Sequence, residues 1–214
     1  MDNAIRIVRT RWKLRGILLL AALALAGVAV AFALNARGGP PRIDEALLRD
    51  GDMLFVRGSS LRGLAVVMAE GGFAYAHVGM IRFEDGRAFV IHASPGGELV
   101  QEQSLTGFLS ASGARHAAVY RLGGGTDAAR TATLASERAR TYFDERRPFD
   151  NAFSLADADS LYCTELVWRA YLEAGTDLCD KCFDTVALPF IKEPVVLPSS
   201  LLRTGRACLI LETE

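Results

Sequence analysis

The stretch "YAHVGMIRFEDGRAFVIHAS", residues 75–94, contains two apolar runs rich in strand-forming residues, which flank the dipeptide Asp85-Gly86. An Asp-Gly pair between two such runs predicts a β-hairpin closed by a two-residue turn. A hairpin needs further strands or a helix to bury its apolar face. The hairpin therefore predicts a larger sheet and helices that cover it.

The turn at Asp85-Gly86 also predicts where two of the three histidines lie. Opposite residues have numbers that sum to 171, so His77 lies opposite Ser94 and His92 lies opposite Gly79. Residues of equal parity share a face of a strand, so the two histidines project from one face as diagonal neighbours. Such neighbours lie about 7–8 Å apart at the backbone, and a one-residue slip would separate them.

Three interpretations of this histidine pair are open on spacing alone. The two side chains are ordinary sheet residues, or they are metal ligands that need a third ligand from elsewhere. In the third interpretation they are a base and the group that orients it, as nucleophilic enzymes require. That interpretation needs a nucleophile elsewhere in the chain.

A cysteine stands at the start of a predicted helix in "SLYCTELVWRAY", residues 160–171. Ser160 is expected to cap this helix, and Glu165 is expected to be a solvated acid. The helix dipole and the free N–H groups at such a position favour a thiolate. Cys163 is thus either a small buried apolar residue or a nucleophile. It lies on the apolar stripe formed by Cys163, Val167, Ala170, Tyr171 and Ala174.

Charge separates the chain into two parts. Residues 1–38 carry six Lys/Arg and one acid, whereas residues 39–214 carry 18 Lys/Arg and 24 Asp/Glu, a net charge of −6. The larger part has no basic stripe, so the sequence does not support nucleic-acid binding. Half of all residues are apolar and 23% are charged, which indicates one globular domain plus an extra segment.

That extra segment is the uncharged run at residues 16–34, which is close to the roughly 20 residues needed to span a bilayer. The basic N-terminus, residues 1–15, is predicted to stay in the cytoplasm, and the part after the span is predicted to be exported. The run exceeds the roughly 7–15 apolar residues of a signal peptide, which favours an uncleaved signal-anchor, although "AFA" at 31–33 resembles a cleavage site. Residues 35–46 are a linker.

Three more cysteines follow the predicted span, and export would place them where disulfides persist. Cys179 and Cys182 form a C-x-x-C pair, and Cys208 lies near the C-terminus. One such pair is weak evidence for zinc. A disulfide of these cysteines, with each other or with Cys208, is therefore expected, with Cys163 left free, and two plain thiols are the alternative.

Strands and helices mix along the chain without strict alternation, which predicts an α+β fold. The long segment before residue 160 is expected to be a solvated acidic loop, and Asp52 is expected to be a turn residue. The predicted strands are 53–56, the two hairpin strands, 97–103, 115–122 and 207–212. The predicted helices are 59–72, 104–111, 127–143 and the helix that begins at Cys163.

Four motifs, in this order, resemble the circularly permuted papain-like cysteine enzymes of the YiiX/YaeF type, within the NlpC-type superfamily. They are "GDMLFVRG", "AHVGMI", "VIHA" and "LYCTELVWRAY". The resemblance covers roughly residues 47–203. It implies that residues 47–214 form a permuted papain-like domain in which an antiparallel sheet packs on the cysteine-bearing helix, preceded by one transmembrane helix.

The resemblance also implies roles for individual residues. Cys163 would be the nucleophile, His77 the base, and His92 the third polar residue, at a position where family members often have glutamate. Tyr162 matches a tyrosine common before the family's cysteine and is expected to line the oxyanion site.

The function implied is a membrane-tethered cysteine hydrolase, an amidase/peptidase or acyltransferase that acts through a thioester without a metal or organic cofactor. The substrate is an amide or ester in a cell-wall peptide, a lipid or an acylated protein. The expected location is the inner (cytoplasmic) membrane, with a single span through residues 16–34 and the catalytic domain outside the cytoplasm. A non-catalytic lipid- or peptide-binding module on the same fold and a metal-stabilised interaction domain are the alternatives.

Overall fold

The computed structural model describes most of the unit that spans residues 40–214. The described ranges are residues 39–58, 75–95, 98–156, 158–186, 191 and 193–213. The predicted span at 16–34 and the predicted helix at 59–72 lie outside these ranges. Within the described ranges no helix is both long and apolar enough to cross a membrane.

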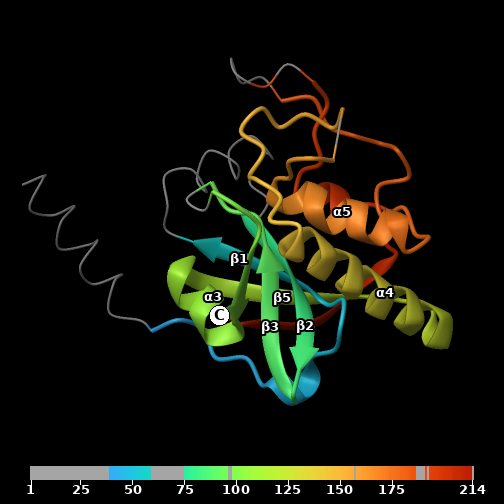
Figure 1. The fold of residues 1–214 in the computed structure, drawn as a ribbon. Coiled ribbons are helices and arrows are strands. Elements are labelled where there is room, and N and C mark those ends of the chain that lie inside the picture. The colour runs from blue at the N-terminus through green and yellow to red at the C-terminus, as the bar shows by residue number, and fades with distance from the viewer. Residues whose placement is uncertain are drawn as a thin grey trace, which may run out of the picture. The chain divides into compact units, whose positions relative to one another are not determined.

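A six-stranded antiparallel sheet forms the centre of this unit (Figure 1), with the strand order β4-β3-β2-β1-β5-β6. The predicted α+β class is confirmed by this sheet and the helices that pack on it. The strands are β1 (Met53–Gly58), β2 (His77–Glu84), β3 (Arg87–His92), β4 (Gln101–Ser104), β5 (Ala114–Leu122) and β6 (Ala207–Thr213). The helices are α3 (Leu105–Ala111), α4 (Gly125–Asp144) and α5 (Cys163–Glu173), with short 3-10 turns at Glu45–Leu47 and Ser199–Leu201.

The predicted hairpin register is confirmed. Met80 pairs with Ile91, and Ile81 pairs with Val90, so opposite residues again sum to 171. Asp85 and Gly86 both have positive φ values, 50° and 76°. Two successive positive φ values define the type I′ turn, which matches the right-handed twist of the flanking strands.

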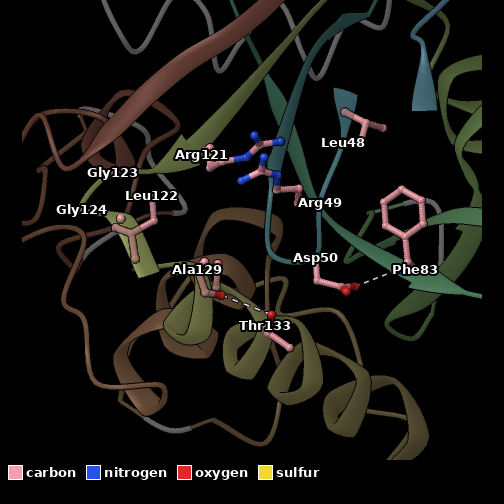
Figure 2. A pocket seen from close by; sticks show the side chains of 12 residues that line it. Leu48, Arg49, Asp50, Phe83, Arg121, Leu122, Gly123, Gly124, Ala129 and Thr133 are labelled. Carbon is pink, nitrogen blue, oxygen red and sulfur yellow. Dashed lines mark hydrogen bonds between the residues drawn. The ribbon is translucent and has the colours of Figure 1, made fainter. Parts of the chain in front are cut away.

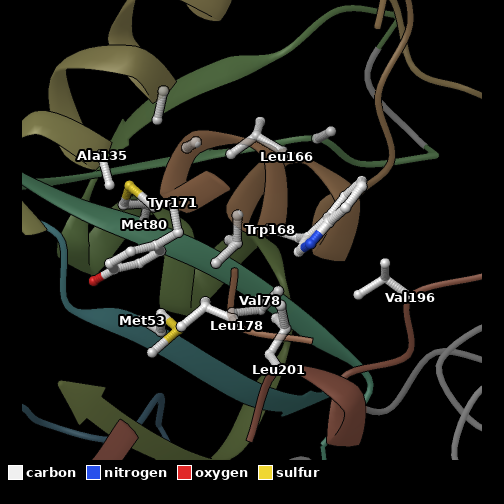
Figure 3. Close-up of a cluster of buried hydrophobic side chains, with 14 of the residues drawn as sticks. Met53, Val78, Met80, Ala135, Leu166, Trp168, Tyr171, Leu178, Val196 and Leu201 are labelled. Atoms are coloured by element: carbon white, nitrogen blue, oxygen red, sulfur yellow. The ribbon is translucent and has the colours of Figure 1, made fainter. Parts of the chain in front are cut away.

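Side chains alternate between the two faces of the sheet, and each face has its own core. On one face Met53, Phe55, Val78, Met80 and Ile91 pack with α4 and α5 (Figure 3). On the other face Leu54, Val56, Ile81 and Val90 pack with α3. Full burial of one such side chain contributes about 1.5–3 kcal/mol, so the two apolar sets fix which face each helix covers.

The close approach of α4 to the start of β1 depends on small residues. Ala128, Ala132, Ala135 and Ala139 are buried along one face of α4. Gly51 has a φ of 80°, and a Cβ atom there would lie 2.2 Å from the carbonyl oxygen of Ala132. The hydroxyl of Tyr171 on α5 donates to the carbonyl oxygen of Gly51 at 2.6 Å, which ties α5 to the same point.

Asp52 ends the turn at residues 49–52, as predicted, because its N–H donates to the carbonyl oxygen of Arg49 at 3.1 Å. It is also a buried ion-pair partner, which the prediction did not include. Its side chain is fully buried and accepts two 2.7 Å hydrogen bonds from the Arg121 guanidinium on β5. It also accepts from the N–H of Arg49 at 2.8 Å, while Arg121 donates to the carbonyl oxygen of Leu47. The Gly51-Asp52 pair predicts a turn. Nothing in the sequence predicts that Arg121, 69 residues away, is the ion-pair partner of Asp52.

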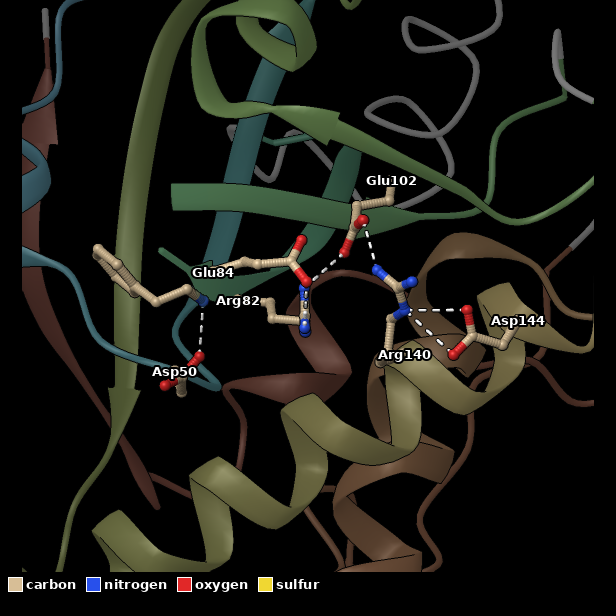
Figure 4. A network of polar contacts seen from close by, with 7 residues as sticks. Asp50, Arg82, Glu84, Glu102, Arg140 and Asp144 are labelled. Carbon is tan, nitrogen blue, oxygen red and sulfur yellow. Dashed lines mark hydrogen bonds and ion pairs between the residues drawn. The ribbon is translucent and has the colours of Figure 1, made fainter. Parts of the chain in front are cut away.

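A second polar network links the sheet to α4 at the surface (Figure 4). Glu102 on β4 accepts from Arg82 on β2 at 3.2 Å and from Arg140 on α4 at 2.7 Å. Arg140 also pairs with Asp144 one turn further along α4, and Arg82 pairs with Glu84. Because this network crosses from β2 and β4 to the helix, it holds α4 over the hairpin side of the sheet.

Candidate active site

His77 and His92 lie side by side, as the hairpin register predicts. Nε2 of His77 lies 3.1 Å from Nδ1 of His92, and the two rings meet edge to face. Both rings also contact Phe108 of α3, with centroid distances of 5.6 and 4.8 Å. Gly79 opposite His92 leaves the space required, because a Cβ atom there would lie 3.2 Å from the His92 Cβ and closer still to Val90.

Burial makes both rings weak bases. Burial, together with the neighbouring His92 ring, lowers the pKa of His77 to about 3. Burial also lowers the pKa of His92 to about 4, which the Gln103 side chain partly offsets. Both imidazoles are therefore neutral at neutral pH. In a neutral ring one nitrogen carries a proton and the other accepts, so the contact between the rings is one N–H···N hydrogen bond.

The histidine pair lies on the α3 face of the sheet, whereas α5 packs on the other face. Val78 and Met80 of β2 share a core with Leu166, Val167 and Tyr171 of α5, which confirms that the cysteine helix packs on this hairpin. His77 is the first residue of β2, so its ring stands at the end of the sheet.

Cys163 is the first residue of α5, and its side chain is half-buried against the core that α5 shares with the sheet. The first N–H groups of a helix have no partner within the helix, so the N–H of Cys163 points out of the helix start. The predicted position of Cys163 at an inward-facing helix N-terminus is therefore confirmed. The arrangement favours a thiolate at this sulfur.

The start of α5 differs from the prediction. The N-cap residue is Tyr162 and not Ser160, and the Glu165 carboxylate accepts from the Tyr162 N–H at 3.4 Å. Glu165 is fully buried and pairs with Arg169 at 2.7 Å, so its prediction as a solvated acid was wrong. Burial raises the pKa of Glu165 to about 7, which the Arg169 charge partly offsets.

Tyr162 is buried beside Cys163. Its hydroxyl accepts a hydrogen bond from the Val196 N–H at 2.9 Å, and its ring packs against Phe153 at 5.2 Å between centroids. A hydroxyl that accepts in this way keeps its own proton for donation. Tyr162 thus anchors the helix start to the C-terminal segment.

The segment before α5 is more ordered than a solvated acidic loop. Asp150 is buried and accepts from the N–H groups of Ala152 and Ser154 at 2.7 and 2.6 Å. The N–H of Leu161 donates to the carbonyl oxygen of Pro148 at 3.0 Å, which closes the loop onto itself. The loop therefore delivers the chain to Cys163 in a defined position.

The other three cysteines are distinct from Cys163. None of the four cysteines forms a disulfide, so the expected disulfide of Cys179 and Cys182 is not present in the described residues. Cys179 is buried, and burial together with Asp177 raises the pKa of its thiol to about 12. Cys182 and Cys208 are exposed. In the described part of the chain no three His, Cys, Asp or Glu side chains are placed to hold a metal ion.

A surface cavity of about 420 Å³ is lined in part by the first turns of α4 (Figure 2). Its lining includes Arg49, Asp50, Arg121 and Thr133, and it borders the glycine-rich turn at residues 123–125. Cys163, His77 and His92 do not contribute to its lining. The cavity therefore does not mark the site that the sequence predicts.

The order of the elements defines a class of fold. A sheet that carries the histidines comes first in the chain, and the helix that begins at the cysteine comes later and packs on that sheet, as in a papain-like fold in circularly permuted order. The chain belongs to the permuted papain-like amidase family, YaeF/YiiX, also called C92, whose pattern matches residues 47–211.

The solved structures include a protein of similar fold. The crystal structure described as metalloprotein yiiX from Escherichia coli O157:H7 aligns with a TM-score of 0.63 and 22% sequence identity. The alignment covers 77% of this chain and 97% of that chain. No match was found among curated proteins.

Proposed function

We propose that this protein is a cysteine hydrolase that cleaves an amide or ester through a thioester on Cys163. The observation that carries the proposal is the histidine pair, in which Nε2 of His77 contacts Nδ1 of His92, so that Nδ1 of His77 is the nitrogen proposed to take the thiol proton. Family membership supports the amidase class. The position of Cys163 at the start of α5 supports its role as the nucleophile.

The first half of the reaction forms the thioester. Nδ1 of His77 takes the thiol proton while the Cys163 sulfur attacks the carbonyl carbon of the substrate. His77 then returns this proton to the leaving amine or alcohol as the carbon–nitrogen or carbon–oxygen bond breaks. The acyl group remains on sulfur, and His77 is again neutral.

The second half releases the acyl group. Nδ1 of His77 takes a proton from water as its oxygen attacks the thioester, and the proton then returns to the Cys163 sulfur as the carbon–sulfur bond breaks. The product is a carboxylic acid. An alcohol or amine in place of water would make the same site an acyltransferase.

Two groups at the start of α5 would stabilise the oxyanion. The backbone N–H of Cys163 lies in the first turn of α5, where N–H groups have no acceptor within the helix. The Tyr162 hydroxyl accepts from the Val196 N–H and keeps its own proton to donate. Loss of one oxyanion donor typically costs about 10²–10³-fold in rate. Tyr162 is thus proposed to line the oxyanion site from the core side.

The third residue of the proposed site, His92, differs from the carboxylate that often orients a catalytic histidine. A neutral His92 accepts from His77 and orients it, but it brings no negative charge to stabilise an imidazolium, as a carboxylate would. The low pKa of His77 is consistent with this uncharged environment. The proposed base therefore works as a neutral ring down to mildly acidic pH.

The proposed location rests on the sequence of the N-terminus. The apolar run at residues 16–34 after a basic segment supports a single span, with the catalytic domain outside the cytoplasm. The proposed substrate is accordingly an amide or ester of a cell-wall peptide, a lipid or an acylated protein at that membrane face.

An alkaline phosphatase reporter fused after Glu214 should be active, because this enzyme folds only in an oxidising compartment. A matched fusion that ends at Arg15, before the span, should be inactive. The proposed orientation would be wrong if the fusion after Glu214 were inactive although the fusion protein was intact.

Transfer of an acyl group from an activated ester to Cys163 tests the proposed chemistry directly. The exposed Cys182 and Cys208 act as controls within the same chain. A non-catalytic binding module on the same fold would show no preference for Cys163.

A further inference from the structure

Two buried polar atoms beside the histidine pair make no hydrogen bond within the described residues. They are Nε2 of His92 and Oε1 of Gln103. Nε2 of His92 can carry a proton and donate it, whereas Oε1 of Gln103 can only accept. Buried polar atoms in folded proteins are nearly always paired, so two complementary unpaired atoms in one region indicate an interaction between them.

The sheet register places these two side chains on the same face. His92 lies opposite Gln101 of β4, and Val90 lies opposite Gln103. Gln103 is therefore the diagonal neighbour of His92, and diagonal neighbours are within reach of long side chains. Both are on the face that packs against Phe108.

The orientation of the Gln103 amide is set from its other end. Its Nε2 donates to Oε1 of Gln101 at 3.4 Å, so the amide nitrogen is committed to β4. The amide oxygen is the end that remains for the ring. Because this oxygen can only accept, the ring nitrogen that faces it must carry a proton.

We propose that Gln103 is a positioning residue that holds His92 in the tautomer protonated at Nε2. In that tautomer Nδ1 of His92 is an acceptor, so the hydrogen bond to His77 must come from a proton on Nε2 of His77. A neutral His77 then has its free electron pair on Nδ1. The last link, from Nδ1 of His77 to the Cys163 thiol, rests on the proposed function, but the tautomer of His92 does not.

The surroundings of His92 allow one neutral residue to have this effect. The groups that face the ring are His77 of β2, Gln101 and Gln103 of β4 and the apolar Phe108 of α3. Glu102 lies between the two glutamines and pairs with Arg82 and Arg140 on the opposite face. No charged side chain on the described elements packed against the ring competes with the amide for control of the tautomer.

Nitrogen-15 NMR of the full-length protein in detergent micelles tests the tautomer, because the chain has only three histidines. At pH 7 the wild type should show His92 protonated at Nε2 and unprotonated at Nδ1. In Gln103→Leu this preference should be lost, and the rate of Cys163 acylation should fall by roughly 10–100-fold, the range seen when a group that orients a histidine is removed.

Gln103→Glu keeps a hydrogen-bond acceptor at this position and adds a negative charge beside the His92 ring. A carboxylate at this position should raise the pKa of His92 by roughly 1–3 units, so the ring should titrate at higher pH than in the wild type. Arg87→Leu, an exposed polar-to-leucine change at the far end of β3, is the matched control and should leave the His92 spectrum unchanged.

Two results would overturn the proposal. One is a wild-type His92 that carries its proton on Nδ1, and the other is a folded Gln103→Leu variant with an unchanged His92 spectrum. A Cys163 that is never acylated in the wild type would instead overturn the proposed function, and the His92 spectrum would still report on the role of Gln103.

Discussion

Replacing His77 with alanine should lower the rate of Cys163 acylation by about 10²–10⁴-fold, the usual cost of losing a general base. The Cys163 thiol should also lose its activation. An activated cysteine has a pKa of about 3.5–7.5, whereas a free cysteine has a pKa near 8.5. The rate of alkylation by iodoacetamide, followed from pH 5 to 9 and mapped to Cys163, should shift toward the higher value in the variant.

His116→Ala is the matched control, because His116 is the remaining histidine and lies exposed on β5. Its alkylation profile should overlay that of the wild type. His92→Ala should have an effect in the same direction as His77→Ala but smaller, since His92 orients the base and does not take the proton. Equal profiles for the wild type and His77→Ala would remove His77 from the site.

Replacing Asp52 with alanine should destabilise the domain by about 3–5 kcal/mol, because it leaves the Arg121 charge without its buried partner. The carboxylate is fully buried and accepts from both Arg121 and the backbone of Arg49. Urea unfolding at pH 7 measures the loss. Asp52 comes just before the first residue of β1, whereas His77 pairs with Val56 near the last residue of β1. The Asp52 variant therefore changes the end of β1 opposite to the one beside the histidine pair.

Asp144→Ala is the control for this prediction, since its carboxylate is 56% exposed and pairs with Arg140 on the surface. Exposed pairs contribute about 0–1 kcal/mol, so the control should unfold close to the wild type. The double variant Asp52→Ala/Arg121→Met should be more stable than Asp52→Ala, because it removes the unpaired charge. A stability loss for Asp52→Ala no larger than that of Asp144→Ala would contradict the role assigned to this pair.

The hairpin was predictable because two local signals agree. The Asp85-Gly86 turn fixes the register, and alternation of apolar residues fixes the faces, so the His77–His92 contact followed from position alone. Cys163 was likewise predictable at the start of α5, since its apolar stripe has a helical period. These features depend on residues that are close in sequence.

Features that depend on distant partners were not predictable. Glu165 has the spacing of a solvated helix acid, and its pairing with Arg169 was visible in the sequence, but its burial is set by the loop that folds over the start of α5. Asp52 receives Arg121 from another strand. Helix and strand propensities depend on residues close in sequence, so they predict neither the burial of Glu165 nor the pair of Asp52 and Arg121.

Gln103 and Phe108 were missed for a related reason. The strand predicted at residues 97–103 had no predicted register against β3, so nothing placed Gln103 beside His92. The short helix α3 was predicted, but not the face of the sheet on which it packs. The expected disulfide was an argument from the cellular compartment, and the structure has Cys179 and Cys182 as free thiols.

The central claim is that Cys163 is the nucleophile of an acyl-transfer enzyme. Intact-mass and peptide mapping of the full-length protein after brief exposure to p-nitrophenyl acetate at pH 6.5 tests it most directly. The predicted result is one acetyl group on Cys163, formed well before any on the exposed Cys182 or Cys208, lost with time in buffer and absent from His77→Ala. Acetylation of Cys182 and Cys208 while Cys163 stays unmodified in the folded protein would contradict the claim.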